Sequence, residues 1–239
     1  MVTLSSMQLL RWLPLIVTLL VAVGCTRSPE AVESGRSSDV PNHPVKRQEP
    51  DVRPVIVAFG DSLSEGLGVE TGFSFPDQLQ KKLDKNGYKY HVINLGVSGD
   101  TTTGGLGRLD YALSLKPVIL ILELGGNDGL RGVPVSSTKA NLEKMIVASQ
   151  QKGVSVLLAG MTLPPNYGPE YVREFESAYK DLAQKYKLRL IPFLMEDILA
   201  QLRAQPGLMQ RDGIHPTAKG HAIIADTVFR YLQPLIAKS

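Results

Sequence analysis

A small set of side chains in this sequence could together carry out acyl transfer. Ser62 has a hydroxyl that can attack a carbonyl carbon, but a free hydroxyl is a weak nucleophile and needs a base. His215 can take that proton, because the pKa of an imidazole lies near neutral pH. Asp212 lies three residues before His215, close enough to fix its tautomer and to stabilise the imidazolium. These residues form a candidate Ser–His–Asp triad.

The tetrahedral intermediate of acyl transfer carries an oxyanion, which needs hydrogen-bond donors that are already in place. We expect these donors to be the backbone amides of Ser62 and Gly99 and the side chain of Asn127. Gly99 suits this role because a residue without a Cβ lets the backbone approach a ligand closely. The sequence therefore offers an oxyanion hole as well as a triad.

Each candidate also has an ordinary structural explanation. Ser62 could cap the helix after a strand, and Asn127 could form a turn after two glycines. Asp212 and His215 could stabilise a loop and the start of a helix. His221 is a rival base, but it lacks a carboxylate three residues earlier, so we expect it to be structural. We favour catalysis because the candidates follow one another at the ends of successive elements.

Apolar runs alternate with helical patterns from Val55 onward. Val55–Phe59 is a β-branched and apolar run that stops at Gly60, which predicts a buried strand ending in a turn. We predict further strands at 88–95, 118–124, 154–159 and 188–191, and helices at 75–86, 101–116, 137–152, 170–186, 193–204 and 217–232. This alternation predicts a three-layer α/β/α sandwich around a parallel sheet of five strands in flavodoxin-like order. The ends of such strands meet at one edge, which would bring the candidate residues together.

The N-terminal part of the chain differs from the rest. Residues 1–25 contain a basic residue, a short apolar run and then Cys25, a pattern typical of a secretory signal. The position of Cys25 resembles that of the lipidated cysteine in bacterial lipoproteins, although an ordinary signal with an incidental cysteine would also fit. Residues 26–54 have few bulky apolar side chains and predict a disordered tether. The folded domain is therefore expected at residues 55–239.

The composition limits the possible functions. The chain has 239 residues, of which 43% are hydrophobic, and this is enough for one sizeable core. A net charge of +3 without a basic cluster does not indicate a nucleic-acid partner. The single cysteine excludes an intrachain disulfide and a cysteine-based metal site. We expect a monomer that needs neither a metal ion nor a cofactor.

The order and spacing of these motifs over residues 55–233 resemble those of the GDSL or SGNH hydrolase superfamily. The matching blocks are Gly60-Asp61-Ser62-Leu63, Gly99, Gly126-Asn127-Asp128 and Asp212-Gly213-Ile214-His215-Pro216. The resemblance is greatest to the bacterial thioesterase I, lysophospholipase L1 and arylesterase group. It implies the same triad and oxyanion donors as the chemistry does. It also implies that the loop at 164–169 is mobile and lies near the acyl site.

We therefore expect a serine hydrolase that cleaves ester or thioester bonds through an acyl intermediate on Ser62. The expected substrates are aryl or acyl esters, acyl-CoA and lysophospholipids. We expect the protein on the periplasmic side of a bacterial membrane, anchored through Cys25 or otherwise soluble in the periplasm.

Three alternatives stay open from the sequence. The first is a carbohydrate O-deacetylase of the same superfamily. The second is a flavin-binding protein, because residues 101–105 are similar to a phosphate loop, although they follow the second strand and not the first. The third is a non-catalytic binding module of the cell envelope, which would not need the triad of Ser62, Asp212 and His215.

Overall fold

A single parallel sheet organises the computed structural model, which describes residues 51–238. Its strands are β1 (Val55–Gly60), β2 (His91–Gly96), β3 (Ile119–Glu123), β4 (Ser155–Ala159) and β5 (Arg189–Ile191). They lie in the order β2-β1-β3-β4-β5, and every neighbouring pair is parallel. This is the five-stranded, flavodoxin-like order that the sequence predicted.

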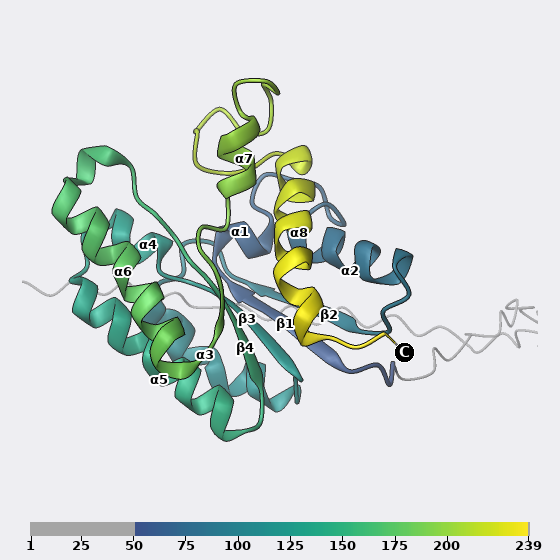
Figure 1. The fold of residues 1–239 in the computed structure, drawn as a ribbon. Coiled ribbons are helices and arrows are strands. Elements are labelled where there is room, and N and C mark those ends of the chain that lie inside the picture. Colours follow the sequence, from purple (N-terminus) through teal and green to yellow (C-terminus); the bar gives the residue numbers. More distant parts are fainter. Residues whose placement is uncertain (1–50, 239) are drawn as a thin grey trace, which may run out of the picture. The chain divides into compact units, whose positions relative to one another are not determined.

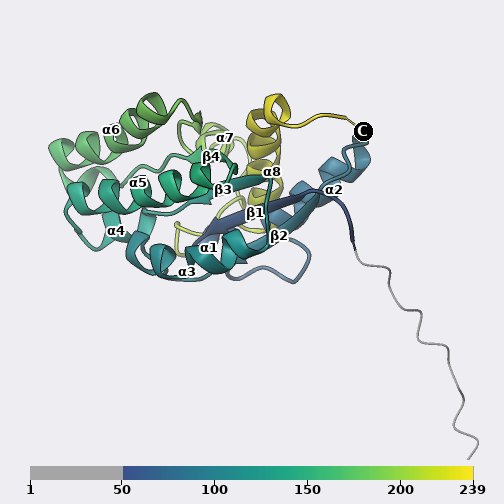
Figure 2. The same cartoon turned by 90° about the horizontal axis from the view of Figure 1, so that it is seen from below.

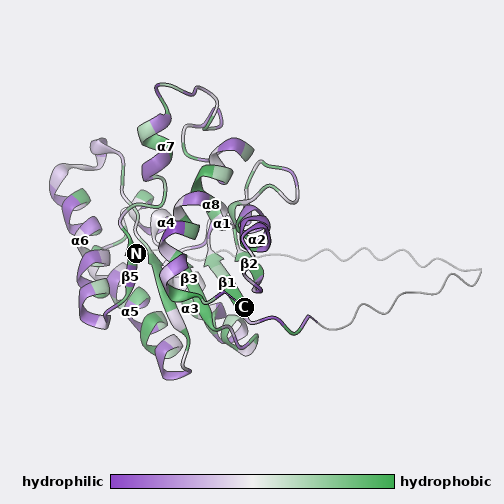
Figure 3. Ribbon diagram, turned by 45° about the vertical axis from the view of Figure 1, so that its right-hand side comes forward, coloured by the Kyte–Doolittle hydropathy of each residue, from purple (hydrophilic) through white to green (hydrophobic). Residues whose placement is uncertain are grey.

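The central strands are apolar because both of their faces are covered. The side chains of β3 are all buried, and Figure 3 shows the hydrophobic strands enclosed by helices with hydrophilic outer faces. Edge strand β2 is only partly buried. The register pairs Gly60 of β1 with Gly96 of β2 and with Glu123 of β3. The carboxyl ends of these three strands are therefore level at one edge of the sheet.

Helices cover the sheet on both faces. Helices α2 (Phe75–Lys85) and α8 (Ala218–Leu232) pack together on one face. Helices α3 (Thr102–Ser114), α5 (Val135–Gln151) and α6 (Pro169–Tyr186) form the layer on the other face (Figures 1 and 2). This arrangement confirms the predicted three-layer sandwich, and it follows from right-handed crossovers between parallel strands.

Short helices lie at the edge where the central strands end (Figure 1). They are α1 (Ser62–Glu65), α4 (Gly126–Leu130) and α7 (Glu196–Gln201), and short 3₁₀ turns occur at Pro165–Tyr167 and Gln233–Leu235. The sequence did not predict α1 or α4, because elements this short show no helical periodicity. Ser64 also lies in α1. The helix expected at 193–204 is confined to α7.

The predicted signal, Cys25 and most of the predicted tether lie outside the described residues. The description begins at Asp51, before the expected start of the domain at Val55. Arg53 donates hydrogen bonds to Asp51 and to Asp84 of α2, so contacts with the domain begin ahead of β1. None of the helices within residues 51–238 has the length and apolar character needed to cross a membrane.

Candidate active site

Ser62 is held where β1 ends and α1 begins. The side chain of Asp61 caps α1 by accepting a hydrogen bond of 3.0 Å from the backbone N–H of Leu63. Ser62 is 8% exposed, and its Oγ lies 2.9 Å from Nε2 of His215. A strand that ends abruptly in a capped turn therefore fixes the backbone of the serine and directs its hydroxyl toward an imidazole.

The second ring nitrogen of His215 contacts Asp212. Nδ1 lies 2.7 Å from Oδ2 of Asp212, while Oδ1 of Asp212 accepts the backbone N–H groups of Ile214 and His215. These hydrogen bonds lower the pKa of Asp212 to about 2, and the bond from the His215 ring has the largest effect. An ionised Asp212 favours the tautomer with hydrogen on Nδ1, which leaves the lone pair of Nε2 facing Ser62.

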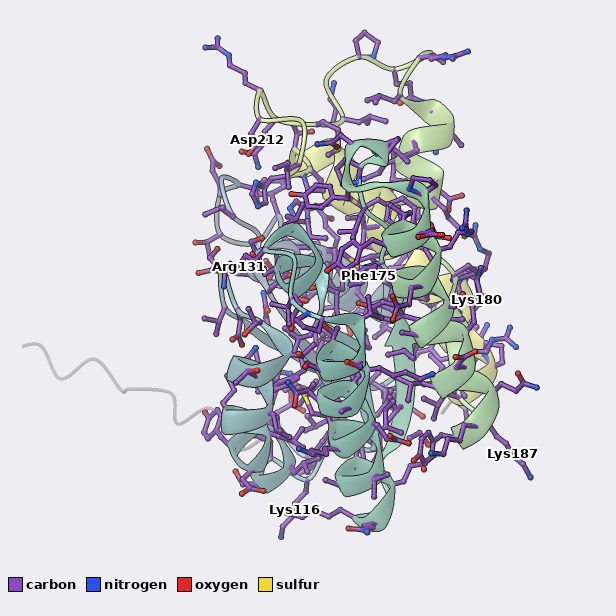
Figure 4. All side chains as sticks on the ribbon, turned by 90° about the vertical axis from the view of Figure 1, so that its left-hand side faces the viewer. Lys116, Arg131, Phe175, Lys180, Lys187 and Asp212 are labelled. Carbon is purple, nitrogen blue, oxygen red and sulfur yellow. The ribbon has the colours of Figure 1, made fainter. Side chains whose placement is uncertain are left out.

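The loop that carries Asp212 and His215 is braced by backbone contacts. Residues Met209 and Pro216 form an antiparallel bridge, and the N–H of Gln210 donates to the carbonyl of His215 at 2.8 Å. The side chain of Gln210 also donates to the carbonyl of Leu67 at 2.7 Å, which joins this loop to the segment after α1. Figure 4 shows Asp212 near the end of the molecule opposite Lys116 and Lys187.

The predicted oxyanion donors come from three different elements. The N–H groups of Ser62 and Gly99 donate no hydrogen bond within residues 51–238, so both can bind an oxyanion. Gly99 has a φ of 77°, a left-handed conformation that favours glycine. Arg131, at the end of α4, donates a hydrogen bond of 2.9 Å to the carbonyl of Gly99. The loop after β2 is thereby fixed against the helix that carries Asn127.

A cavity of about 490 Å³ opens beside Ser62 and His215. Its walls are mostly hydrocarbon, contributed by Leu63, Leu130, Met161, Leu163, Pro164, Pro165, Phe193, Met195, Leu199 and Ile214. The loop at 164–169 contributes two of these residues, which places it beside the candidate nucleophile. A volume of this size is typical of small-molecule sites, and the lining favours an apolar ligand.

Two buried carboxyl groups, those of Asp61 and Glu123, lie next to the turn that carries the candidate nucleophile, and the contact between these two residues was not predicted from the sequence. Glu123 accepts hydrogen bonds from the hydroxyl of Ser64 at 2.8 Å and from the N–H of Asp61 at 3.2 Å. Burial raises the pKa of Glu123 well above its usual value and raises the pKa of Asp61 to about 6. A signal was present, because Glu123 ends an otherwise apolar strand.

Two further residues, His221 and Arg108, hold neighbouring elements together through hydrogen bonds. His221 is fully buried, and its Nδ1 accepts the N–H of Phe75, so the rival base is occupied in joining α8 to α2. Arg108 donates to the carbonyl of Leu95, near the end of β2, and to that of Gly60, the last residue of β1. Arg108 therefore braces the edge of the sheet near the candidate nucleophile.

The described residues contain no group of three or more His, Cys, Asp or Glu side chains arranged to hold a metal ion. The chemistry that this site can perform with its own side chains is nucleophilic attack assisted by a base and by oxyanion donors.

Comparison with known proteins places this chain in a family. Residues 58–223 match the model of the GDSL-like lipase/acylhydrolase family. The chain belongs to the GDSL-like lipase/acylhydrolase family. This match confirms the resemblance seen in the sequence and makes the chain a GDSL esterase.

Similar GDSL proteins span the described domain. Esterase TesA of Pseudomonas aeruginosa is 41% identical over 182 residues, which cover 76% of this chain and 89% of that protein. Thioesterase 1/protease 1/lysophospholipase L1 of Escherichia coli strain K12 is 37% identical and covers 76% of this chain and 84% of that protein. A crystal structure of TesA superposes with a TM-score of 0.71 at 40% identity, covering 76% of this chain and 99% of that one.

Proposed function

We propose that this GDSL esterase cleaves carboxylic ester or thioester bonds through an acyl intermediate on Ser62. The observation that supports the proposal is the continuous chain of contacts from Ser62 Oγ to His215 Nε2 and from His215 Nδ1 to Asp212. Each contact is at hydrogen-bond distance, which a nucleophile and its base require.

The reaction proceeds in two halves. His215 Nε2 takes the proton of the Ser62 hydroxyl as Oγ attacks the carbonyl carbon, and the oxyanion is met by the amides of Ser62 and Gly99 and by Asn127. The intermediate collapses to an acyl ester of Ser62, and His215 returns the proton to the departing alcohol or thiol. Water then attacks the acyl ester with the same base, releases the carboxylic acid and restores the serine.

Labelling with a fluorophosphonate tests the nucleophile. We expect the probe to be recovered on Ser62, and we expect Ser62→Ala to abolish both labelling and hydrolysis of p-nitrophenyl esters. The matched control is Ser64→Ala, which removes the neighbouring buried hydroxyl of α1 and should keep both activities. Full hydrolysis by Ser62→Ala, or a label on another residue, would contradict the proposal.

The apolar cavity supports a substrate with a hydrocarbon acyl or aryl group, such as an acyl ester, an acyl-CoA or a lysophospholipid. The names of the relatives, which include esterase and thioesterase 1/lysophospholipase L1, support the same classes. A carbohydrate O-deacetylase needs room only for an acetyl group. A series of p-nitrophenyl esters separates these possibilities. We expect kcat/KM to rise from acetate to octanoate, whereas a maximum at acetate with hydrolysis of acetylated xylan would favour the deacetylase.

We also propose that the chain is exported and anchored through a lipid on Cys25. The support is the apolar run that precedes Cys25 in the sequence and the polar residues that follow it. Cells fed with radiolabelled palmitate should label the wild-type chain and not Cys25→Ser. Equal labelling of the two chains, or no labelling of either, would contradict the proposal of a lipid on Cys25.

A further inference from the structure

Asp61 takes no step in the proposed reaction, yet its carboxylate lies between the nucleophile and an oxyanion donor. Asp61 is 3% exposed. Its Oδ1 accepts the N–H of Leu63 at 3.0 Å, and its Oδ2 accepts Nδ2 of Asn127 at 3.0 Å. A buried carboxylate is expensive to keep, so its contacts need a physical explanation.

The contact with Asp61 determines which end of the Asn127 side chain faces the carboxylate. A carboxylate can only accept hydrogen bonds, so the NH₂ group of Asn127, and not its carbonyl oxygen, must point to Oδ2. The NH₂ group has two hydrogens, and the contact with Asp61 uses one of them. The second hydrogen is left to meet an oxyanion formed at Ser62.

We propose that Asp61 is a positioning residue that locks the carboxamide of Asn127 in the orientation that donates to the oxyanion. The inference rests on the proposed function of Ser62 and adds a residue to that site. The backbone of Asp61 directly precedes the nucleophile, so one turn fixes both Ser62 and the acceptor for Asn127.

Asp61 is itself held in place from two sides. Its N–H donates to Oε2 of Glu123, and its Oδ1 serves as the N-cap of α1. Burial, and after it the nearby charge of Asp61, raises the pKa of Glu123 well above its usual value, which favours the neutral form of Glu123 beside an ionised Asp61. One carboxylate and one carboxylic acid can share this small volume, whereas two charges could not.

The variant Asp61→Asn tests the lock with almost no change of volume. Its side-chain oxygen can still cap Leu63, but its NH₂ group then faces the NH₂ group of Asn127. The carboxamide of Asn127 must turn, which removes its N–H from the oxyanion. Loss of one oxyanion donor costs roughly 10²–10³-fold in kcat, the loss expected for Asn127→Ala. We expect Asp61→Asn to lower kcat at least about 10-fold while KM changes little.

A double-mutant cycle separates positioning from a structural role. If Asp61 acts through Asn127, adding Asp61→Asn to Asn127→Ala should change kcat less than about twofold. The matched control is Ser64→Ala, which removes a neighbouring buried hydroxyl and leaves the contact between Asp61 and Asn127 in place. We expect this control to keep kcat within about threefold of the wild type.

Nuclear magnetic resonance gives a readout that does not depend on turnover. The signals of the two side-chain amide protons of Asn127 can be assigned by their loss in Asn127→Ala. In the wild-type protein these two protons should exchange with solvent at different rates. The proton bound to Asp61 should be protected, and the other should become protected when Ser62 is phosphonylated. This measurement uses the wild-type chain, so it stands even if Asp61→Asn does not fold.

Three results would overturn the inference. They are a kcat for Asp61→Asn within threefold of the wild type, a loss that multiplies with that of Asn127→Ala, or equal and unprotected exchange of both amide protons. A wild-type chain without serine-dependent hydrolysis would instead refute the proposed function, and the exchange experiment would still report the orientation of Asn127.

Discussion

At the scale of single residues, hydrogen bonds keep a partly exposed carboxyl group in the site, that of Asp212, in its ionised form. The side chain of Asp212 is 44% exposed, yet three hydrogen bonds from its own loop lower its pKa to about 2. The pKa of Asp61, in contrast, is raised to about 6 by burial. Asp212 therefore stays ionised across the acidic range, and its two oxygens have separate tasks.

The separate tasks of Asp212 lead to a prediction for Asp212→Asn. The asparagine oxygen should keep accepting the N–H groups of Ile214 and His215, which places its NH₂ group against Nδ1 of His215. The imidazole must then carry its hydrogen on Nε2, where it cannot accept the proton of Ser62. We expect kcat on a p-nitrophenyl ester to fall roughly 10³–10⁴-fold with little change in melting temperature. A loss below tenfold would indicate a Ser–His dyad.

At the scale of elements, the functional groups lie on short helices and loops, while the long helices support the sheet. Backbone strain nevertheless occurs at the C-terminal ends of two long helices, after α3 at Lys116 and after α6 at Lys187. Helix α6 ends at Tyr186, and its C-cap residue Lys187 has a φ of 53°, a left-handed conformation that is unfavourable for a residue with a Cβ. Figure 4 shows Lys187 at the far end of the molecule from Asp212, so the strain can be altered without touching the site.

Lys187→Gly should stabilise the protein. Glycine adopts the left-handed conformation without a steric penalty, and the gain should be about 0.5–1 kcal/mol in the free energy of unfolding. Thermal unfolding should show an increase of about 1–4 °C in Tm. The matched control is Lys180→Gly in the interior of α6, also exposed, which should lower the free energy of unfolding by about 1 kcal/mol. Equal losses for both variants would contradict the prediction.

At the scale of the whole molecule, buried apolar packing and a few buried polar contacts hold the elements together. His221 is one of these contacts, because it accepts the N–H of Phe75 and so joins α8 to the start of α2. Burial lowers the pKa of His221 to about 4, and the charge of His215 acts in the same direction while Asp77 opposes it. His221 is therefore neutral when the protein is folded at neutral pH.

This burial predicts a loss of stability in acid. The pKa of His221 is about 4 in the folded state against an ordinary value of 6.5, so the unfolded state binds the proton first as the pH falls. The contribution of neutral His221 to stability is fully present above pH 6.5 and is lost between pH 6.5 and 4, by about 3 kcal/mol. His221→Gln can still accept from Phe75 but cannot titrate. Urea unfolding at pH 7 and pH 4 should show a smaller loss for this variant, and parallel losses would contradict the prediction.

The sequence alone determined the sheet, its order and the identity of the candidate triad. Strand patterns are local, since apolar runs such as Val55–Phe59 must be buried whatever follows them. Parallel connection then forces the ends of the strands to one edge, which brings Ser62 and Asn127 to the same side of the sheet. The other two members of the candidate triad could be paired from the sequence, because Asp212 and His215 lie three positions apart and interact within one loop.

Only the tertiary structure decided what surrounds these residues. The short helices α1 and α4 have too few residues to show a period. The contact of Asp61 with Asn127 joins residues 66 positions apart, and that of Asp61 with Glu123 joins residues 62 positions apart. Because hydrogen-bond partners and burial depend on such distant neighbours, the sequence could name a candidate nucleophile but could not reveal the contact between the buried residues Asp61 and Glu123 beside it.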